Sequence, residues 1–109
     1  KAEKFRKGGD FERAAEHYRK ALSLKRDLKV ALQATRVLLN ADAQLDQAEL
    51  FARAALRIDN DHVEARMMLG RVFERQYKTD RAVAQYERVL ELDEDHDKAR
   101  TRRKRLVCD

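Results

Sequence analysis

Apolar and small residues recur along this chain at a fixed interval of 34 residues. The clearest column is Ala14, Ala48 and Ala82. Other columns keep their chemistry at the same interval: Phe5, Leu39 and Phe73; Tyr18, Ala52 and Tyr86; Ala21, Ala55 and Val89; Leu22, Leu56 and Leu90; Leu24, Ile58 and Leu92; Asp27, Asp61 and Asp95. A period of this length is typical of a repeat architecture. We therefore expect one structural unit that occurs about three times.

The spacing inside each unit predicts helices. In the third copy the apolar residues are Ala82, Val83, Tyr86, Val89 and Leu90, which fall on one helical face with a period near 3.6 residues. No run alternates strictly enough to favour a strand, and the chain has no proline and three glycines. One unit cannot bury its apolar face alone, so stacked neighbours should form a continuous core.

With these columns the chain resembles a tetratricopeptide repeat domain, whose unit is two antiparallel helices in 34 residues. Residues 63–96 match the family best. The matching residues are Leu69, Gly70 and Phe73 on the first helix of the unit and Ala82, Tyr86 and Val89 on the second. The resemblance implies an all-α fold, a right-handed superhelical stack of antiparallel helix pairs.

The resemblance covers essentially the whole chain, which we expect to be a single domain, residues 1–109. Its expected parts are a first repeat at 1–28 that lacks its start, a second at 29–62, a third at 63–96 and a basic capping helix at 97–109. Since Lys1 falls at about the seventh position of the unit, we expect further residues before it in the parent protein. The run from Gly8 to Phe11 resembles the family's turn between its two helices.

The second repeat departs from the family pattern. Thr35 and Arg36 occupy the Leu-Gly pair, and Ala52 replaces the second aromatic residue. Either the first helix of this repeat is shifted, or Arg36 extends out of a close helix contact.

A nearby departure concerns Leu50 and Phe51, which occupy columns held by Glu16 and His17 in the first repeat. They either fill the space left by Ala52 or contact a partner, or a second copy of the chain, on the convex face.

Composition favours an ordered domain. Charged residues make up 41% of the chain, but hydrophobic residues make up 43% and fall on periodic faces. The single cysteine, Cys108, has no disulfide partner, which is compatible with a reducing compartment, and we expect a cytoplasmic location. No apolar run approaches a membrane span, and we expect no membrane insertion. The oligomeric state stays open.

Motifs for catalysis or for a cofactor are missing from the sequence. There is no glycine-rich phosphate loop, nucleophile elbow or Cys/His ligand spacing, so we expect no enzyme activity, no cofactor and no metal. His62 and His96 share one repeat position near the turn to the next repeat. A turn preference explains them better than a metal pair, because a whole repeat separates them.

The net positive charge of the chain belongs to its tail. Residues 97–109 carry six basic and two acidic residues, and the net charge of the whole chain is +5. A helix over Asp97–Val107 could cover the last repeat with Ala99, Leu106 and Val107 and present a polar face that stops the stack. The alternatives are a nucleic-acid or acidic-partner patch and a nuclear-import signal.

The resemblance also implies a concave groove, lined by the second, fifth, ninth and twelfth positions of each unit. The expected groove residues are Val30, Gln33, Val37 and Asn40 in the second repeat, Glu64, Met67, Arg71 and Glu74 in the third, and Lys98, Thr101 and Arg105 in the tail helix. Apolar and cationic members together suit a peptide with hydrophobic and acidic side chains. A solvated helix face is the competing interpretation.

We therefore predict a non-enzymatic scaffold that binds a peptide segment of a partner protein in this groove. The alternative function is binding of nucleic acid or an acidic surface through the basic C-terminal helix. Family members that bind the C-terminal carboxylate of heat-shock chaperones use Lys and Asn on successive first helices. Here the corresponding positions hold Glu3, Ala34, Met67 and Met68, so we expect no chaperone-tail binding.

Overall fold

The computed structural model describes the backbone of residues 2–107 and the side chains of residues 10–107. Cys108 lies outside the described residues. The chain forms six helices within that range: α1 (Ala2–Leu24), α2 (Leu28–Ala41), α3 (Leu45–Ile58), α4 (Val63–Arg75), α5 (Thr79–Leu92) and α6 (Asp97–Val107). No strand occurs among the described residues. The expected all-α fold is confirmed.

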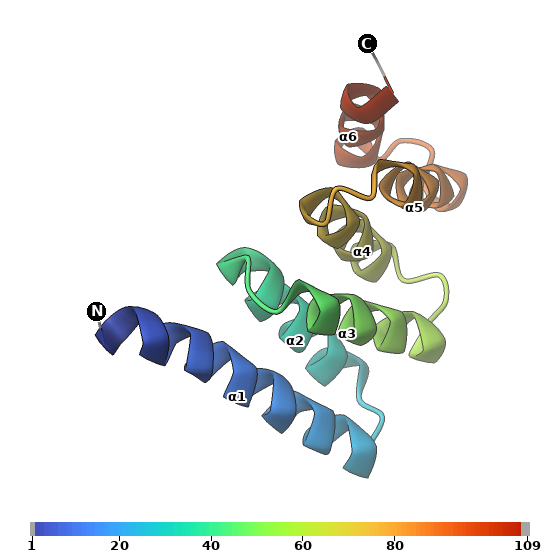
Figure 1. Ribbon diagram of the computed structural model, residues 1–109. Coiled ribbons are helices and arrows are strands. Elements are labelled where there is room, and N and C mark those ends of the chain that lie inside the picture. Colours follow the sequence, from blue (N-terminus) through green and yellow to red (C-terminus); the bar gives the residue numbers. More distant parts are fainter. Residues whose placement is uncertain (1, 108–109) are drawn as a thin grey trace.

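The helices stack in chain order, so that α1 and α6 lie at opposite ends (Figure 1). Each helix packs on the next, and α2 also packs on α4. Because contacts join near neighbours, the domain is flat, with extents of 42 × 35 × 18 Å. Neighbour-to-neighbour stacking of this kind is how solenoids build one core from units that are unstable alone.

The expected turn at Gly8 and Gly9 is wrong, because α1 runs without a break from Ala2 to Leu24. A turn would fold the seven residues before Gly8 back onto the rest of the helix. So short a segment buries little apolar surface. Continuing the helix keeps its backbone hydrogen bonds, at a cost of about 1 kcal/mol for each glycine relative to alanine.

The repeated small residues lie where helices pack closely. Ala48 and Ala82 are fully buried, and in α1 the buried alanine is Ala15. Gly70 on α4 lies against the ring of Tyr86 on α5, and both are buried. The Leu-Gly and aromatic columns therefore mark a small-against-large contact between the two helices of a pair.

In the second helix pair, the two residues that replace the Leu-Gly pair are accommodated by local contacts. Thr35 is buried, and its hydroxyl donates to the Ala31 carbonyl at 2.8 Å. The Arg36 side chain is exposed and pairs with Glu64 of α4 at 2.6 Å, as one of the two alternatives expects.

Phe51 is 3% exposed and packs edge-to-face on Tyr18, with ring centroids 6.1 Å apart. Phe51 thus takes part in local packing. Leu50, by contrast, is 51% exposed.

The tandem histidines cap helices, which confirms a turn role. His62 Nδ1 accepts from the Ala65 backbone N–H at 3.1 Å, and His96 Nδ1 accepts from that of Ala99 at the same distance. Both residues precede the first residue of their helix and satisfy a backbone donor that the helix leaves free.

The tail helix α6 packs on α5. Ala99 is fully buried and Leu106 is half-buried against the core, as expected, but Val107 is 49% exposed. A role in stopping the stack stays a prediction.

Candidate functional site

A groove of about 830 Å³ opens between α2, α4 and α6. Its floor is apolar, because Leu39, Met67 and Met68 are almost fully buried there. Polar and charged side chains form its walls. The lining residues are Arg36, Leu39, Asn40, Val63, Glu64, Met67, Met68, Arg71, His96, Asp97, Lys98, Thr101, Arg102 and Arg105.

The structure brings seven of the eleven predicted groove residues to this one surface. They are Asn40, Glu64, Met67, Arg71, Lys98, Thr101 and Arg105. They come from α2 and α4, which are the first helices of their pairs, and from α6, which stands in the place of the next first helix. Their convergence therefore follows from the stacking of successive units. Whether they contact a partner stays a prediction.

Three predicted residues of α2 lie outside the groove: Val30, Gln33 and Val37. The α2 wall is made instead by Arg36, Leu39 and Asn40. Successive residues of a helix are turned by about 100° from one another, so a shift of one position selects a neighbouring face. The position rules of the well-matched third repeat therefore select only Asn40 among the α2 residues that line the groove.

Glu74 is the fourth predicted residue that does not line the groove. Its carboxylate lies between α4, α5 and α6, where its side chain is 20% exposed. Glu74 Oε2 accepts from the Tyr86 hydroxyl and from Arg102 Nη1, the latter at 3.2 Å. Burial, and next the hydrogen bond to Glu74, raise the pKa of Tyr86 well above its usual range. Glu74 is thus a structural residue that positions Arg102 on the groove wall.

Sequence reasoning missed several lining residues, among them Arg36, Leu39, Met68 and Arg102. Leu39 was assigned to the core, and it does lie there while also forming floor. Arg36 left a usable signal, since a charged residue stands in the family's glycine column. Such a departure indicates that the chain keeps that helix face for something other than a close helix contact.

The groove is electropositive. Five basic and two acidic residues line it, apart from His96. Arg36 pairs with Glu64 at 2.6 Å, and Arg102 with Glu74. Among the described residues, no ion pair joins Arg71, Lys98 or Arg105 to an acidic group. These three cations are available to a ligand beside the apolar floor.

Half of the basic residues in the tail are already paired. Arg100 contacts Asp97 at 3.4 Å, Arg102 contacts Glu74, and Arg103 contacts Glu87 at 3.1 Å. The first contact lies within the first turn of α6, and the other two join α6 to the third repeat. The charge left for a polyanion is therefore smaller than the sequence indicates.

The positions that correspond to the chaperone-tail clamp offer no donor to a carboxylate. Ala34 is fully buried, and Met67 and Met68 form groove floor. The side chain of Glu3 lies outside the described residues. No group of three or more possible metal ligands occurs among the described residues. Among the described helices, none has the length and apolar character needed to cross a membrane.

Two tetratricopeptide-repeat family models match this sequence, over residues 2–32 and 63–96. The chain belongs to the tetratricopeptide repeat family. No curated protein matches the chain in sequence. The second matched segment contains α4, α5 and the groove residues from Glu64 to Arg71.

Solved structures with the same fold include three repeat domains of other proteins. The TPR domain of Arabidopsis OM64 is 24% identical, with a TM-score of 0.76 over 93% of this chain and 84% of its own. The first TPR domain of Spaghetti (RPAP3), bound to the HSP90 peptide SRMEEVD, is 20% identical, with a TM-score of 0.76 over 95% and 82%. The second TPR domain of human RPAP3, in complex with the HSP70 peptide SGPTIEEVD, is 21% identical, with a TM-score of 0.78 over 98% and 89%. At these identities the likeness shows the fold alone.

Proposed function

We propose that this tetratricopeptide repeat domain is a non-enzymatic interaction module that binds a peptide segment of a partner protein in the groove between α2, α4 and α6. The proposal treats residues 1–109 as a single domain, with repeats at 1–28, 29–62 and 63–96 and a capping helix at 97–109. A cytoplasmic location remains a prediction.

The observation that carries the proposal is the pairing of an apolar floor with unpaired cations. Met67 and Met68 offer a floor to hydrophobic side chains, and methionine adapts to different shapes. Arg71, Lys98 and Arg105 converge from two helices at its edge and suit carboxylates. The expected ligand is therefore a segment with a large apolar residue close to an acidic one. The RPAP3 domains support a peptide as the ligand class, since both are bound to peptides that contain acidic residues.

A selection of peptides from a random library tests the proposal. Because Met67 is only 8% exposed, its truncation would also destabilise the fold, so the test uses the charged wall. Peptides selected on the unmodified domain should lose about tenfold or more in affinity to the Arg71→Glu/Lys98→Glu variant, the loss expected for interface hot spots. Helical circular dichroism should stay unchanged.

Arg81→Glu provides a matched control, because it reverses an exposed cation of α5 away from the groove. Selected peptides that bind both proteins equally would contradict the proposal. Binding of generic oligonucleotides with a steep log-log dependence on salt, lost on reversal of Arg103 and Lys104, which lie outside the groove lining, would favour the tail-based alternative instead.

A further inference from the structure

A second cavity lies away from the groove, between the C-terminal part of α1 and α3. It has a volume of about 340 Å³ and shares no lining residue with the groove. Its apolar lining is Leu22, Leu50, Phe51, Ala54 and Ile58. We call it the α1–α3 notch. Its size is at the small end of the range for ligand pockets, about 300 to 1,000 Å³, and suits inserted side chains.

The rim of the notch is basic. Arg19, Arg26 and Arg57 line it together with Ser23, and no acidic residue does. Arg19 donates to the Gln47 amide oxygen at 2.6 Å, and among the described residues none of the three arginines pairs with a carboxylate. Exposed apolar surface ringed by unneutralised cations is a combination that an acidic partner would complement.

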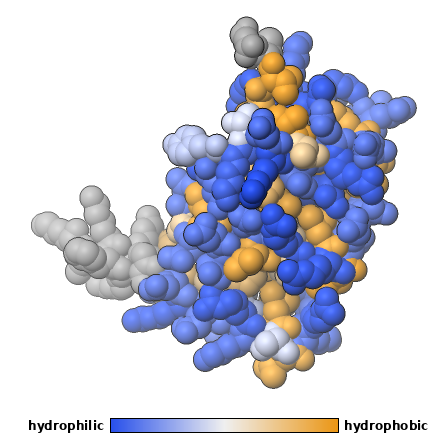
Figure 2. All heavy atoms as spheres, turned by 45° about the vertical axis from the view of Figure 1, so that its right-hand side comes forward, coloured by the Kyte–Doolittle hydropathy of each residue, from blue (hydrophilic) through white to orange (hydrophobic). Residues whose placement is uncertain are grey.

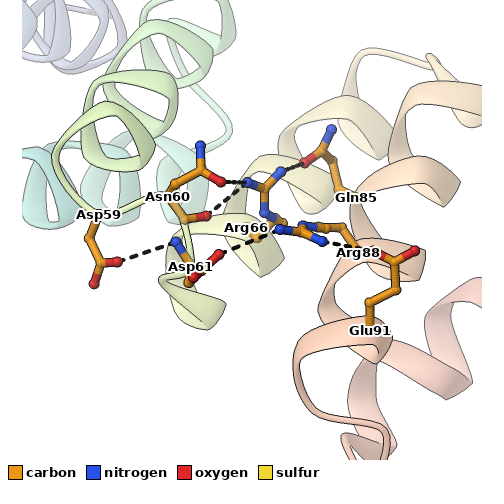
Figure 3. Close-up of polar contacts among 7 residues, drawn as sticks. All are labelled: Asp59, Asn60, Asp61, Arg66, Gln85, Arg88 and Glu91. Carbon is orange, nitrogen blue, oxygen red and sulfur yellow. Dashed lines mark hydrogen bonds and ion pairs between the residues drawn. The ribbon is translucent and has the colours of Figure 1, made fainter.

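The corresponding place one repeat later is built differently. Adding 34 to Arg26, Phe51, Ala54 and Arg57 gives Asn60, Gln85, Arg88 and Glu91. Figure 3 shows Asn60 and Gln85 turned toward Arg66, and Arg88 turned toward Glu91 and Asp61. Repeat geometry therefore allows a direct comparison of the two places.

In the later repeat the side chains satisfy one another. Arg66 donates to Gln85 Oε1 at 3.1 Å and to the Asn60 carbonyl at 2.9 Å, and Arg88 pairs with Glu91 at 2.9 Å and with Asp61 at 3.5 Å. In the notch, Phe51 stands in the column of Gln85, Ala54 in that of Arg88, and Arg57 in that of Glu91. These exchanges remove the internal partners and leave an apolar surface with free cations.

Leu50 also gives the notch an exposed apolar surface. It stands in a column held by Glu16 and Ala84, yet it is 51% exposed and does not fill the space beside Ala52. Orange apolar residues occur only in small patches between blue hydrophilic ones on the face shown in Figure 2. About half of the Leu50 surface is therefore open to a partner beside the basic rim.

We propose that the α1–α3 notch is a second protein-docking site, which takes a large apolar side chain from an acidic segment of a partner protein. The apolar side chain contacts Leu22, Leu50 and Ile58. Flanking carboxylates pair with Arg19, Arg26 and Arg57. The site is independent of the groove, so one domain of this size can hold two segments at once.

The test selects a random peptide library on the domain and on a variant whose notch carries the residues of the later repeat, Ala54→Arg/Arg57→Glu. A second variant, Leu50→Glu, installs the residue of the first repeat in that column. Both changes are at exposed or half-buried positions, so the fold should persist. Val107→Glu is the control, because it adds a charge at another half-exposed apolar residue.

We expect a class of peptides with a large apolar residue flanked by Asp or Glu, whose affinity falls about tenfold or more on both notch variants. The Val107→Glu control and the groove variant Arg71→Glu/Lys98→Glu should leave this class unaffected. In methyl NMR spectra, Leu22, Leu50 and Ile58 should shift when such a peptide is added.

Four outcomes would overturn the proposal. They are the absence of any peptide class that distinguishes the notch variants, enrichment of peptides without acidic residues, a loss of binding on the groove variant instead, and self-association of the domain in sedimentation that Leu50→Glu abolishes. The last would make a second copy of this chain the occupant. Groove-dependent peptides would still be found if only the notch proposal failed.

Discussion

Gly70 lies so close to Tyr86 that a Cβ atom on it would come within 2.6 Å of the tyrosine Cε1 and 2.8 Å of its Cζ. The tyrosine ring is fully buried, so it cannot turn aside as an exposed side chain would. The contact joins α4, which forms the central wall of the groove, to α5, which carries no groove residue. The distance between these helices therefore depends on one missing methyl group.

Gly70→Ala should destabilise the domain by about 1 to 3 kcal/mol, the usual cost of overpacking a core. The gain in helix propensity, about 1 kcal/mol, offsets only part of the strain. Urea unfolding followed by circular dichroism measures the effect, with Arg81→Ala as an exposed control that should stay within about 0.5 kcal/mol. Equal midpoints for the two variants would mean that Tyr86 is not held as rigidly as its burial indicates.

A second prediction concerns the histidine caps. His62→Ala removes the acceptor for the Ala65 N–H and should cost about 0.5 to 2 kcal/mol. His62→Asn should restore most of the loss, since asparagine is a preferred N-cap residue. The exposed His17 on α1 supplies the control, and His17→Ala should change the unfolding midpoint little. If asparagine were no better than alanine, the imidazole would act through some contact other than capping.

The columns predicted the core because they report a local requirement that repeats. A small residue facing an aromatic ring, as Gly70 faces Tyr86, recurs in the family pattern at a fixed spacing. The third repeat keeps this pair and can be identified by it, whereas the second repeat has Arg36 and Ala52 there. The groove-lining residues were predicted less completely than the core, because they depend on which face of each first helix borders the next one. On α2 the lining residues are Arg36, Leu39 and Asn40, and Thr35 is buried. The substituted Leu-Gly pair thus supplies one core residue and one groove residue that the family pattern does not predict.

The position of Glu74 shows a second limit of sequence reasoning. Its place in the unit is that of a groove residue, but Arg102 from α6 and Tyr86 from α5 draw its carboxylate into the helix junction. Both partners are distant in sequence, and no periodic pattern records their pairing. Its position in the repeat predicts the surroundings of a polar side chain only when no hydrogen-bonding partner from another helix draws it elsewhere.

The contact between Tyr86 and Glu74 should make the free energy of unfolding fall as the pH becomes alkaline. In the unfolded chain a tyrosine ionises near pH 10, whereas burial and Glu74 raise the pKa of Tyr86 in the folded state. The unfolded state therefore loses its proton first. The contribution of Tyr86 to stability is full below about pH 10 and is lost as the pH rises above it.

Urea midpoints between pH 7 and 11 measure this dependence, and Tyr86→Phe should flatten its alkaline limb. The substitution should also cost about 1.5 to 3 kcal/mol at neutral pH, because a hydrogen bond to the Glu74 carboxylate is removed. Tyr77→Phe, at a side chain that is 92% exposed, controls for the loss of one tyrosine. An alkaline limb that Tyr86→Phe leaves as steep as before would assign the dependence to other groups.

The last prediction separates this domain from the chaperone-bound structures that share its fold. The peptide SRMEEVD, bound by the first RPAP3 domain, should bind here no better when its C-terminal carboxylate is free than when it is amidated. The reason is that Ala34, Met67 and Met68 offer no donor at the positions where the family's clamp has Lys and Asn. In a clamp, charge-assisted hydrogen bonds are worth about 1.5 to 3 kcal/mol each, so amidation would weaken binding about tenfold or more. Fluorescence anisotropy with both forms of the peptide measures the ratio. A tenfold preference for the free carboxylate, abolished by Arg71→Glu/Lys98→Glu, would mean that the groove cations replace the clamp and that the clamp positions do not decide chaperone-tail binding.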